Sequence, residues 1–167
     1  MPQGSPNGQR VLVVDIRARR FGYVVMEGPD KLLDWGVRTH STGGGSVLSD
    51  GVLNLCKRFG PSLIVTRHVR QADRRYRTRA RAGIQEVRMT ARRIPIPVQL
   101  VSSSSLVQYF SRGNKTSKYE RARMVATHFP ELAWRLPPKR KAWQSELKRT
   151  TIFDAASIGM FHFAQRE

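Results

Sequence analysis

The sequence predicts an α/β fold in which helices cover a mixed β-sheet. Three short segments rich in β-branched residues follow one another near the N-terminus with only tight turns between them, which indicates an antiparallel meander. Further along the chain, apolar segments of strand length alternate with segments of helical periodicity, which favours parallel strands joined through helices.

The first three strands are expected at residues 10–16, 21–28 and 31–38. RVLVVDI and FGYVVMEG are β-branched runs joined by the short connection RARR, so they are predicted to form a hairpin. GPDK provides a turn that leads to the third strand, KLLDWGVR. These three strands form the antiparallel half of the sheet.

A helix and a buried strand follow the loop THSTGGGS. Apolar residues recur at helical spacing from Val52 to Phe59, with Ser49 or Asp50 as the candidate cap, and the Gly-Pro pair that follows ends the helix. SLIVT is a continuous apolar run of strand length, which is typical of a parallel strand buried on both faces.

The arginine-rich segment from Asp73 to Arg93 is predicted to be a basic helix. It contains no proline, and Ile84, Val87 and Met89 give it a thin apolar face. We expect it to end before IPIP and to be followed by the strand VQLVS.

Three further helices complete the prediction. SSSLVQYF is expected to be a short helix capped by one of the serines. Residues 118–129 are expected to form a helix that stops at Pro130, and residues 143–163 a last helix with one broad apolar face.

The chain is expected to be a flexible leader, residues 1–9, and a single domain, residues 10–167. The single Cys56 excludes an internal disulfide framework and a multi-cysteine zinc site, and it is expected to be buried and inert. No apolar stretch approaches the roughly 20 residues that span a bilayer. These features favour the cytoplasm or another reducing intracellular compartment.

The charge of the chain indicates a polyanionic partner. Thirty Lys and Arg residues against twelve Asp and Glu give a formal net charge of +18. Arginine dominates the densest run, and its guanidinium group suits bidentate contact with phosphate. Nucleic acid is therefore the expected partner. A membrane surface is less favoured, because the run lacks a bulky apolar face, and a merely solvated basic helix is the alternative.

Two acids occupy unusual places. Asp15 ends an apolar strand and is followed by several arginines, so it is either a metal ligand or a structural acid paired with Arg17, Arg19 or Arg67. Asp154 lies in the apolar helical stretch IFDAASIGMF, where an unpaired charge is costly, so it must meet a partner or an ion. The four histidines have no metal-binding spacing. Two tryptophans, Trp134 and Trp143, are expected either to stack on bases or to pack against the protein.

The order of elements, together with particular motifs, resembles the RuvC Holliday-junction resolvases of the ribonuclease H-like superfamily. VLVVDIRARRFGYVVME is similar to the family's first strand and hairpin, in which an Asp ends the strand and a Gly-Tyr pair begins the next. The run from PSLIVTRHVR to NKTSKYERARMV follows the family's later elements, and FDAASIGM is similar to the helix with the last carboxylate. The resemblance covers about residues 10–163 and implies a ribonuclease H-like mixed sheet.

The resemblance implies a cluster of carboxylates that holds Mg²⁺ or Mn²⁺ for phosphodiester hydrolysis. Asp15 and Asp154 are the residues carried over as catalytic and metal-binding. Arg67 stands where the family has its second carboxylate, which puts the metal in doubt, and is expected to pair with Asp15 or Asp154 and lower its pKa. Thr151 stands where many relatives have another acid. The glycine expected soon after Asp15 is also absent. A third acid is not identified; Asp73 and Glu86 are candidates that more simply pair with arginines of their own helix.

The predicted nucleic-acid contacts are basic residues of the hairpin, the fourth strand, the basic helix and the loop that carries junction-contacting lysines in the family. They are Arg17, Arg19, Arg20, Arg67, Arg70, Arg74, Arg75, Arg77, Arg79, Arg81, Lys115 and Lys118. Arg70 falls where some relatives have an aromatic residue that helps to open the junction. By the same resemblance the chain is expected to be a homodimer.

Two functions remain open from the sequence. The first is a divergent, Mg²⁺-dependent, structure-selective endodeoxyribonuclease of recombination that uses Asp15 and Asp154 and favours DNA junctions over RNA. The second is a catalytically inactive RuvC-like nucleic-acid-binding module or ribonucleoprotein subunit, with the active site lost at Arg67. Restoring an acid by Arg67→Glu separates the two, because it creates metal-dependent cleavage only where the rest of the site is intact.

Overall fold

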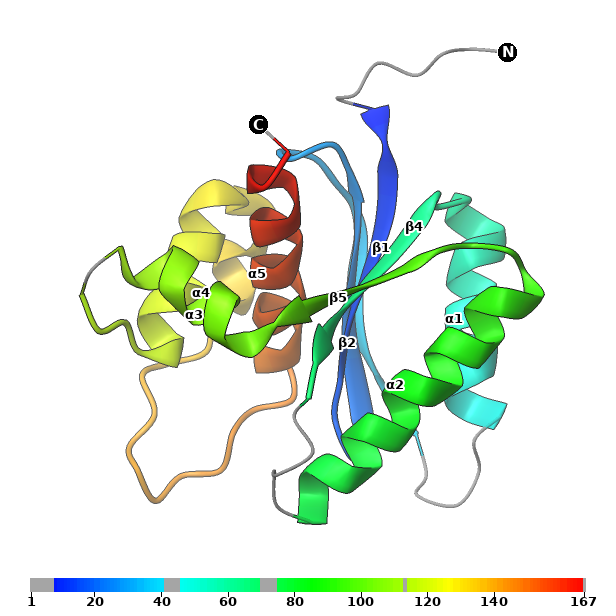
Figure 1. Cartoon of the computed structure of the whole chain (residues 1–167). Helices are drawn as coiled ribbons and strands as arrows, with labels where there is room; N and C mark the ends of the chain where they lie inside the picture. Colours follow the sequence, from blue (N-terminus) through cyan, green and yellow to red (C-terminus); the bar gives the residue numbers. More distant parts are fainter. Residues whose placement is uncertain (1–7, 41–45, 70–74, 113, 167) are drawn as a thin grey trace.

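The computed structural model describes residues 8–40, 46–69, 75–112 and 114–166, and the side chains of all of these except residues 46 and 75–77. It contains one five-stranded sheet with the strand order β3-β2-β1-β4-β5. The strands are β1 (Arg10–Ile16), β2 (Arg20–Glu27), β3 (Leu32–Thr39), β4 (Leu63–His68) and β5 (Val98–Ser102) (Figure 1).

The helices alternate with the later strands as the sequence predicts. They are α1 (Ser46–Phe59), α2 (Arg75–Arg93), α3 (Ser103–Ser111), α4 (Lys118–His128) and α5 (Thr150–Ala164), with a short 3₁₀ helix, η2 (Pro130–Arg135), after α4. Serines cap two of them: Ser102 accepts from the amide of Ser105, and Ser117 forms a capping box with Glu120.

Strand β1 lies at the centre of the sheet. It pairs antiparallel with β2 and parallel with β4, and β4 pairs parallel with β5. Strand β3 pairs antiparallel with β2 at the other edge. The predicted mixed sheet, with three antiparallel strands followed by two parallel ones, is therefore confirmed.

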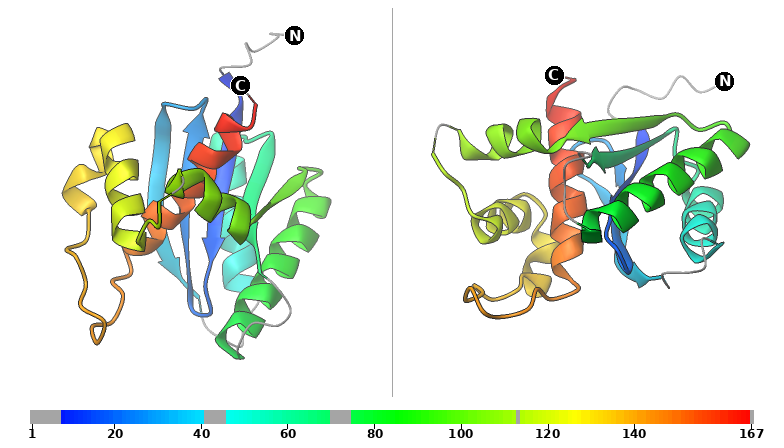
Figure 2. Two further views of the ribbon diagram at one scale, coloured as in Figure 1. Left: turned by 60° about the vertical axis from the view of Figure 1, so that its left-hand side comes forward. Right: turned by 60° about the horizontal axis from the view of Figure 1, so that its bottom comes forward.

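Helices cover both faces of the sheet, so successive residues of β1 enter two different cores. Val11 and Val13 pack with α3, α4 and α5. Leu12, Val14 and Ile16 pack with α1 and α2. Figure 2 shows α1 and α2 on one face of the sheet and α3, α4 and α5 on the other. Because side chains alternate along a strand, Asp15 must lie on the face that α5 covers.

Helix α5 lies unusually close to β2. A methyl group in place of the Gly22 hydrogen would overlap the main-chain carbonyl of Thr151, in the first turn of α5. The glycine therefore permits the approach that brings this end of α5 to the end of β1.

Three expectations are corrected. The last helix begins at Thr150 and not at Trp143, because no neighbouring element buries the apolar side chains of residues 143–149: Trp143 is 78% exposed and Leu147 45%. Helix α1 begins at Ser46, so Ser49 lies inside it and does not cap it. Met89 is 65% exposed, because the buried face of α2 is instead formed by Ala80, Ile84, Val87 and Ala91.

None of the helices in the described part of the chain combines the length and the apolar character that crossing a membrane requires.

Candidate functional site

Asp15 and Asp154 meet under the first turns of α5. Asp15 is the second-last residue of β1 and faces α5, and Asp154 lies one turn into that helix. Both are buried, with 1% and 5% of their surface exposed. The two acids predicted as metal ligands are thus brought together.

Arg17 lies between the two acids. Its Nε donates to Oδ2 of Asp15 at 2.8 Å, and its Nη2 donates to Oδ2 of Asp154 at 2.7 Å. Arg17 is two residues beyond Asp15, so an extended chain directs both side chains to the same face. One guanidinium group therefore bridges both carboxylates.

Arg67 pairs with Asp15 from the neighbouring strand. Val14 is opposite Thr66 in the parallel register, so the next residues along β1 and β4 are Asp15 and Arg67. Nη2 of Arg67 lies 3.4 Å from Oδ1 of Asp15, an ion pair without a hydrogen bond in the described structure. The expected pairing is confirmed, and it is looser than that of Arg17.

Asp154 meets two further cations from α4. Nζ of Lys118 lies 3.2 Å from its Oδ2, and Nη2 of Arg121 lies 3.8 Å from its Oδ1. Each of the four carboxylate oxygens of Asp15 and Asp154 therefore has a positively charged group within 4 Å.

Glu146 is a third acid of this cluster, and the sequence gives no sign of it. Lys118 bridges it to Asp154: Nζ of Lys118 lies 2.9 Å from Oε2 of Glu146. Nη2 of Arg20 lies 3.9 Å from its Oε1. Glu146 belongs to the segment between η2 and α5, whose path cannot be read from periodicity, so no sequence pattern links it to Asp154.

Arg20 also contacts Thr151, which stands where many members of the family have an additional acid. Its Nε donates to Oγ1 of Thr151 at 3.1 Å, and that hydroxyl group donates to the carbonyl of Lys148. Thr151 is fully buried. The Thr151 position thus holds a neutral side chain bonded to a cation.

The cluster as a whole is positive. Three carboxylates, those of Asp15, Glu146 and Asp154, stand against the five cations Arg17, Arg20, Arg67, Lys118 and Arg121. Two positive charges are left over. The site therefore attracts an anion more strongly than it attracts a cation.

The ionic neighbours act differently on the two buried acids. Burial alone would raise the pKa of Asp15, but Arg67 and Arg17 together lower it below its usual value. For Asp154, burial and the negative charge of Asp15 raise the pKa, and Lys118, Arg17 and Arg121 offset this only in part. The expected lowering holds for Asp15 and is wrong for Asp154, because repulsion by Asp15 adds to burial.

The residues present do not fit the divalent metal that the fold family implies. Mg²⁺ and Mn²⁺ need free oxygen ligands, whereas here the oxygens of both carboxylates face guanidinium or ammonium groups. Among the residues that the structure describes, no three His, Cys, Asp or Glu side chains are grouped so as to hold a metal ion. A cation entering this arrangement would have to displace Arg17 first.

A wide cleft of about 650 Å³ opens beside the cluster. It lies at the end of β1, between the hairpin, the end of β4 and the start of α2. Five predicted contact residues line it, and Glu146 forms part of its wall: the five are Arg17, Arg19, Arg20, Arg67 and Arg79. We call it the arginine cleft.

The other predicted contacts lie around this cleft. Arg81 lines a neighbouring hollow of about 440 Å³ with Arg88 and His68, Lys118 belongs to the acid cluster, and Lys115 is exposed in the loop before α4. Arg70 and Arg74 lie outside the described residues, as do the side chains of Arg75 and Arg77.

Of the two candidates for a third metal-binding acid, the structure describes only Glu86, which lies against α1, on the opposite face of the sheet from α5. Glu86 accepts a hydrogen bond from Ser49 of α1 at 2.7 Å, and among the described side chains no arginine of its own helix donates to it. Asp73 lies outside the described residues.

No protein-family model and no curated protein matches this sequence. Solved structures do match its fold. Thermus thermophilus RuvC in complex with Holliday junction substrate has a TM-score of 0.71 at 19% identity, over 95% of each chain. Another Thermus thermophilus RuvC structure gives 0.65 at 21% identity, over 95% of this chain and 96% of that one. The yeast mitochondrial Holliday junction resolvase Ydc2 gives 0.63 at 16% identity, over 95% of this chain and 80% of that one.

These likenesses confirm the fold that the sequence motifs imply. The chain has the ribonuclease H-like fold of the RuvC resolvases, at an identity that identifies the fold alone.

Proposed function

We propose that this chain binds branched nucleic acid in the arginine cleft, with DNA junctions preferred, and that it does so without metal-dependent cleavage. The observation that carries the proposal is the position of Arg17, whose guanidinium group bridges Asp15 and Asp154. Where carboxylates of a nuclease would hold metal ions against a phosphate group, this chain offers guanidinium groups directly.

The charge of the cleft supports phosphate as the ligand. Arg17 and Arg67 keep their side chains 27% and 24% exposed while they neutralise Asp15. The weaker ion pair of Arg67 leaves its guanidinium group available for a second anion. A phosphodiester in the cleft would meet the excess positive charge that the acids do not cancel.

The choice of a branched ligand rests on the structures of the same fold. One of them is a RuvC in complex with a Holliday junction substrate, and another is a Holliday junction resolvase. The match with the RuvC complex covers 95% of this chain. By the same likeness we propose a homodimer, because a four-way junction offers two equivalent strands.

The absence of cleavage is proposed from the ionic neighbours of the acids. At about 4 Å and an effective dielectric constant near 20, two unit charges interact by roughly 4 kcal/mol. The cations that pair with Asp15 and Asp154 would weaken the attraction of these acids for a metal ion. The same cations would repel the ion. The divergent endonuclease is the alternative function, and it requires Arg17 to leave both acids.

The test compares binding and cleavage on labelled four-way DNA junctions, linear duplexes and structured RNA. Each substrate is incubated with the protein in chelator, in Mg²⁺ and in Mn²⁺. We expect junction binding that requires no metal, and no cleavage in chelator, Mg²⁺ or Mn²⁺. Metal-dependent cleavage that Asp15→Asn abolishes would overturn the proposal in favour of the endonuclease. Equal affinity for structured RNA and junctions would instead favour a ribonucleoprotein subunit.

A charge-matched pair of variants locates the binding site. Arg79→Ala removes a charge from the arginine cleft, and Arg58→Ala removes one from the end of α1, near the start of β1 at the other end of the sheet. We expect Arg79→Ala to weaken binding of all sequences and to reduce the slope of log K against log salt by about 1. Arg58→Ala should change neither quantity.

A further inference from the structure

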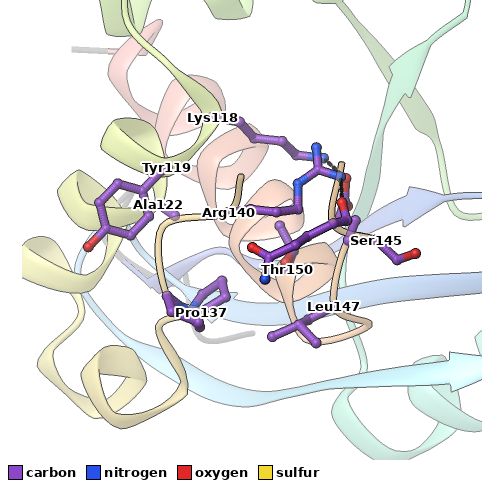
Figure 3. Close-up of a pocket in the computed structure, with 11 residues that line it drawn as sticks. Lys118, Tyr119, Ala122, Pro137, Arg140, Ser145, Leu147 and Thr150 are labelled. Carbon is purple, nitrogen blue, oxygen red and sulfur yellow. Dashed lines mark hydrogen bonds and ion pairs between the residues drawn. The ribbon is translucent and has the colours of Figure 1, made fainter. Parts of the chain in front are cut away.

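A further pocket adjoins the arginine cleft at Glu146, under the segment between η2 and α5. It has a volume of about 230 Å³ and is enclosed by the first turns of α4, residues 137–147 and the start of α5 (Figure 3). Its lining residues include Tyr119, Ala122, Pro137, Pro138 and Leu147 as apolar groups.

Polar groups stand among these apolar walls. Arg140, Gln144 and Ser145 line the pocket together with Lys118 and Glu146. The segment also holds itself in place: Arg140 donates to the main-chain carbonyl of Gln144, and the Gln144 side chain accepts from the amide of Lys141 at 2.9 Å. Apolar walls with a few ordered polar groups suit a flat ring with a polar edge.

The two cations that line this pocket, Lys118 and Arg140, already have partners within the protein, and Arg140 donates to the main-chain carbonyl of Gln144. Nζ of Lys118 is already shared between Glu146 and Asp154, at 2.9 and 3.2 Å. The carboxylate of Glu146 itself lines the pocket and would repel a phosphate group. A nucleobase is both neutral and flat, whereas the phosphodiester backbone is neither.

The pocket and the arginine cleft share one wall. Glu146 lines both. A strand whose phosphate groups lie in the cleft therefore passes next to Glu146, and the pocket lies on the other side of this residue. A nucleotide that has no pairing partner could place its base behind Glu146 without moving its phosphate out of the cleft.

Exposed aromatic rings in this part of the chain give independent support. Trp143, next to the pocket residue Gln144, is 78% exposed, and Trp134, in η2 before the segment begins, is 72% exposed. Basic groups accompany them: Nζ of Lys141 lies 5.7 Å from the ring centre of Trp143, and the guanidinium carbon of Arg135 lies 4.3 Å from that of Trp134. Exposed aromatic rings among positive charges are typical of surfaces on which unpaired bases stack.

We propose that this pocket accepts an unpaired nucleobase of the strand that the arginine cleft holds. The inference rests on the proposed function, because the cleft must bind the strand first. It adds a preference that phosphate contacts alone do not give: the chain distinguishes nucleic acids that expose a base from those that are fully paired.

The test uses a junction and a duplex that each carry one unpaired 2-aminopurine, the same substrates with an abasic site at that position, and a fully paired duplex. Three variants are compared with the parent. Tyr119→Ala removes an aromatic wall, Tyr119→Phe keeps it as a matched control, and Ser145→Trp fills the pocket from an exposed position. Circular dichroism checks that each variant is folded.

We expect Tyr119→Ala and Ser145→Trp to weaken binding of the unpaired substrates about tenfold and to abolish the change in 2-aminopurine fluorescence. Tyr119→Phe, and the affinity of every protein for the paired duplex, should be unchanged. An abasic site in place of the unpaired base should weaken binding by the parent protein by the same factor of about ten. If the parent binds junctions, and Arg79→Ala weakens them, but the abasic site and both pocket variants have no effect, the pocket proposal fails alone. If the parent binds none of these nucleic acids, both proposals fail.

Discussion

Arg17 and Asp154 are 137 residues apart in the sequence, yet Nη2 of Arg17 lies 2.7 Å from Oδ2 of Asp154. The same guanidinium group binds Asp15 through Nε. The two contacts tie the central strand β1 to the helix α5 that covers it, at the point where a nuclease of this fold would need free carboxylates. Burial opposes the charge of Arg17, but the two acids outweigh burial and raise its pKa further, so it is always charged.

Arg17→Met should destabilise the protein by about 2 to 4 kcal/mol, because it leaves two buried carboxylates with fewer partners. Arg19→Met is the matched control: Arg19 is exposed in the same turn, so its loss should change the free energy of unfolding by less than about 0.5 kcal/mol. Urea denaturation measures both. Equal effects of the two substitutions would mean that the bridge contributes nothing to stability.

The sequence could predict the fold because each element carries a local signal. The β-branched apolar run of β1, the Gly-Pro stop after α1 and the serine caps of α3 and α4 act within a few residues of chain. Asp15 and Asp154 could be predicted for the same reason, since each is a charge inside an apolar element. The sequence left open whether these acids pair with cations or bind a metal ion.

The rest of the site depends on long-range geometry. Glu146 and Arg121 carry no pattern that relates them to Asp15, and they reach the cluster only because the segment before α5 and the helix α4 pack where they do. The start of α5 was misplaced for a related reason. Residues 143–149 have weak helical periodicity, but no neighbouring surface buries them.

Arg67→Glu alone should not produce metal-dependent cleavage. The substitution brings the cluster to four carboxylates and four cations, and Arg17 and Lys118 still occupy oxygens of Asp15 and Asp154. The double variant Arg17→Met/Arg67→Glu has four carboxylates and three cations. We expect it to bind Mn²⁺ in calorimetric titrations where the parent and Arg67→Glu do not. Cleavage by Arg67→Glu alone would mean that Arg17 leaves the acids readily.

Gly22→Ala should destabilise the protein by about 2 to 3 kcal/mol. The new methyl group overlaps the Thr151 carbonyl, and neither β2 nor α5 can move without disturbing packed cores. Thermal unfolding measures the loss. Gly8→Ala is the control, because nothing lies within 4 Å of the methyl group it adds. A tolerated Gly22→Ala would show that α5 can shift away from β2.

His162 makes stability depend on pH near neutrality. It is 1% exposed, and neither ring nitrogen has a hydrogen-bond partner in the described structure. Burial, with the charge of Arg166, lowers its pKa below the ordinary value of 6.5. The unfolded chain therefore binds the proton more readily than the folded chain does. Its contribution to stability is complete above pH 6.5 and is lost as the pH falls toward the lowered pKa.

His162→Leu should accordingly remove this dependence and stabilise the protein, by on the order of 1 kcal/mol at pH 5, because leucine buries no unpaired nitrogen. Urea denaturation at pH 7.5 and at pH 5 measures how the free energy of unfolding changes with pH in the variant and in the parent. His68→Asn, at an exposed position, should keep the parent's pH dependence. If His162→Leu and the parent lose the same stability between the two pH values, another group is responsible and the His162 ring is not held neutral by burial.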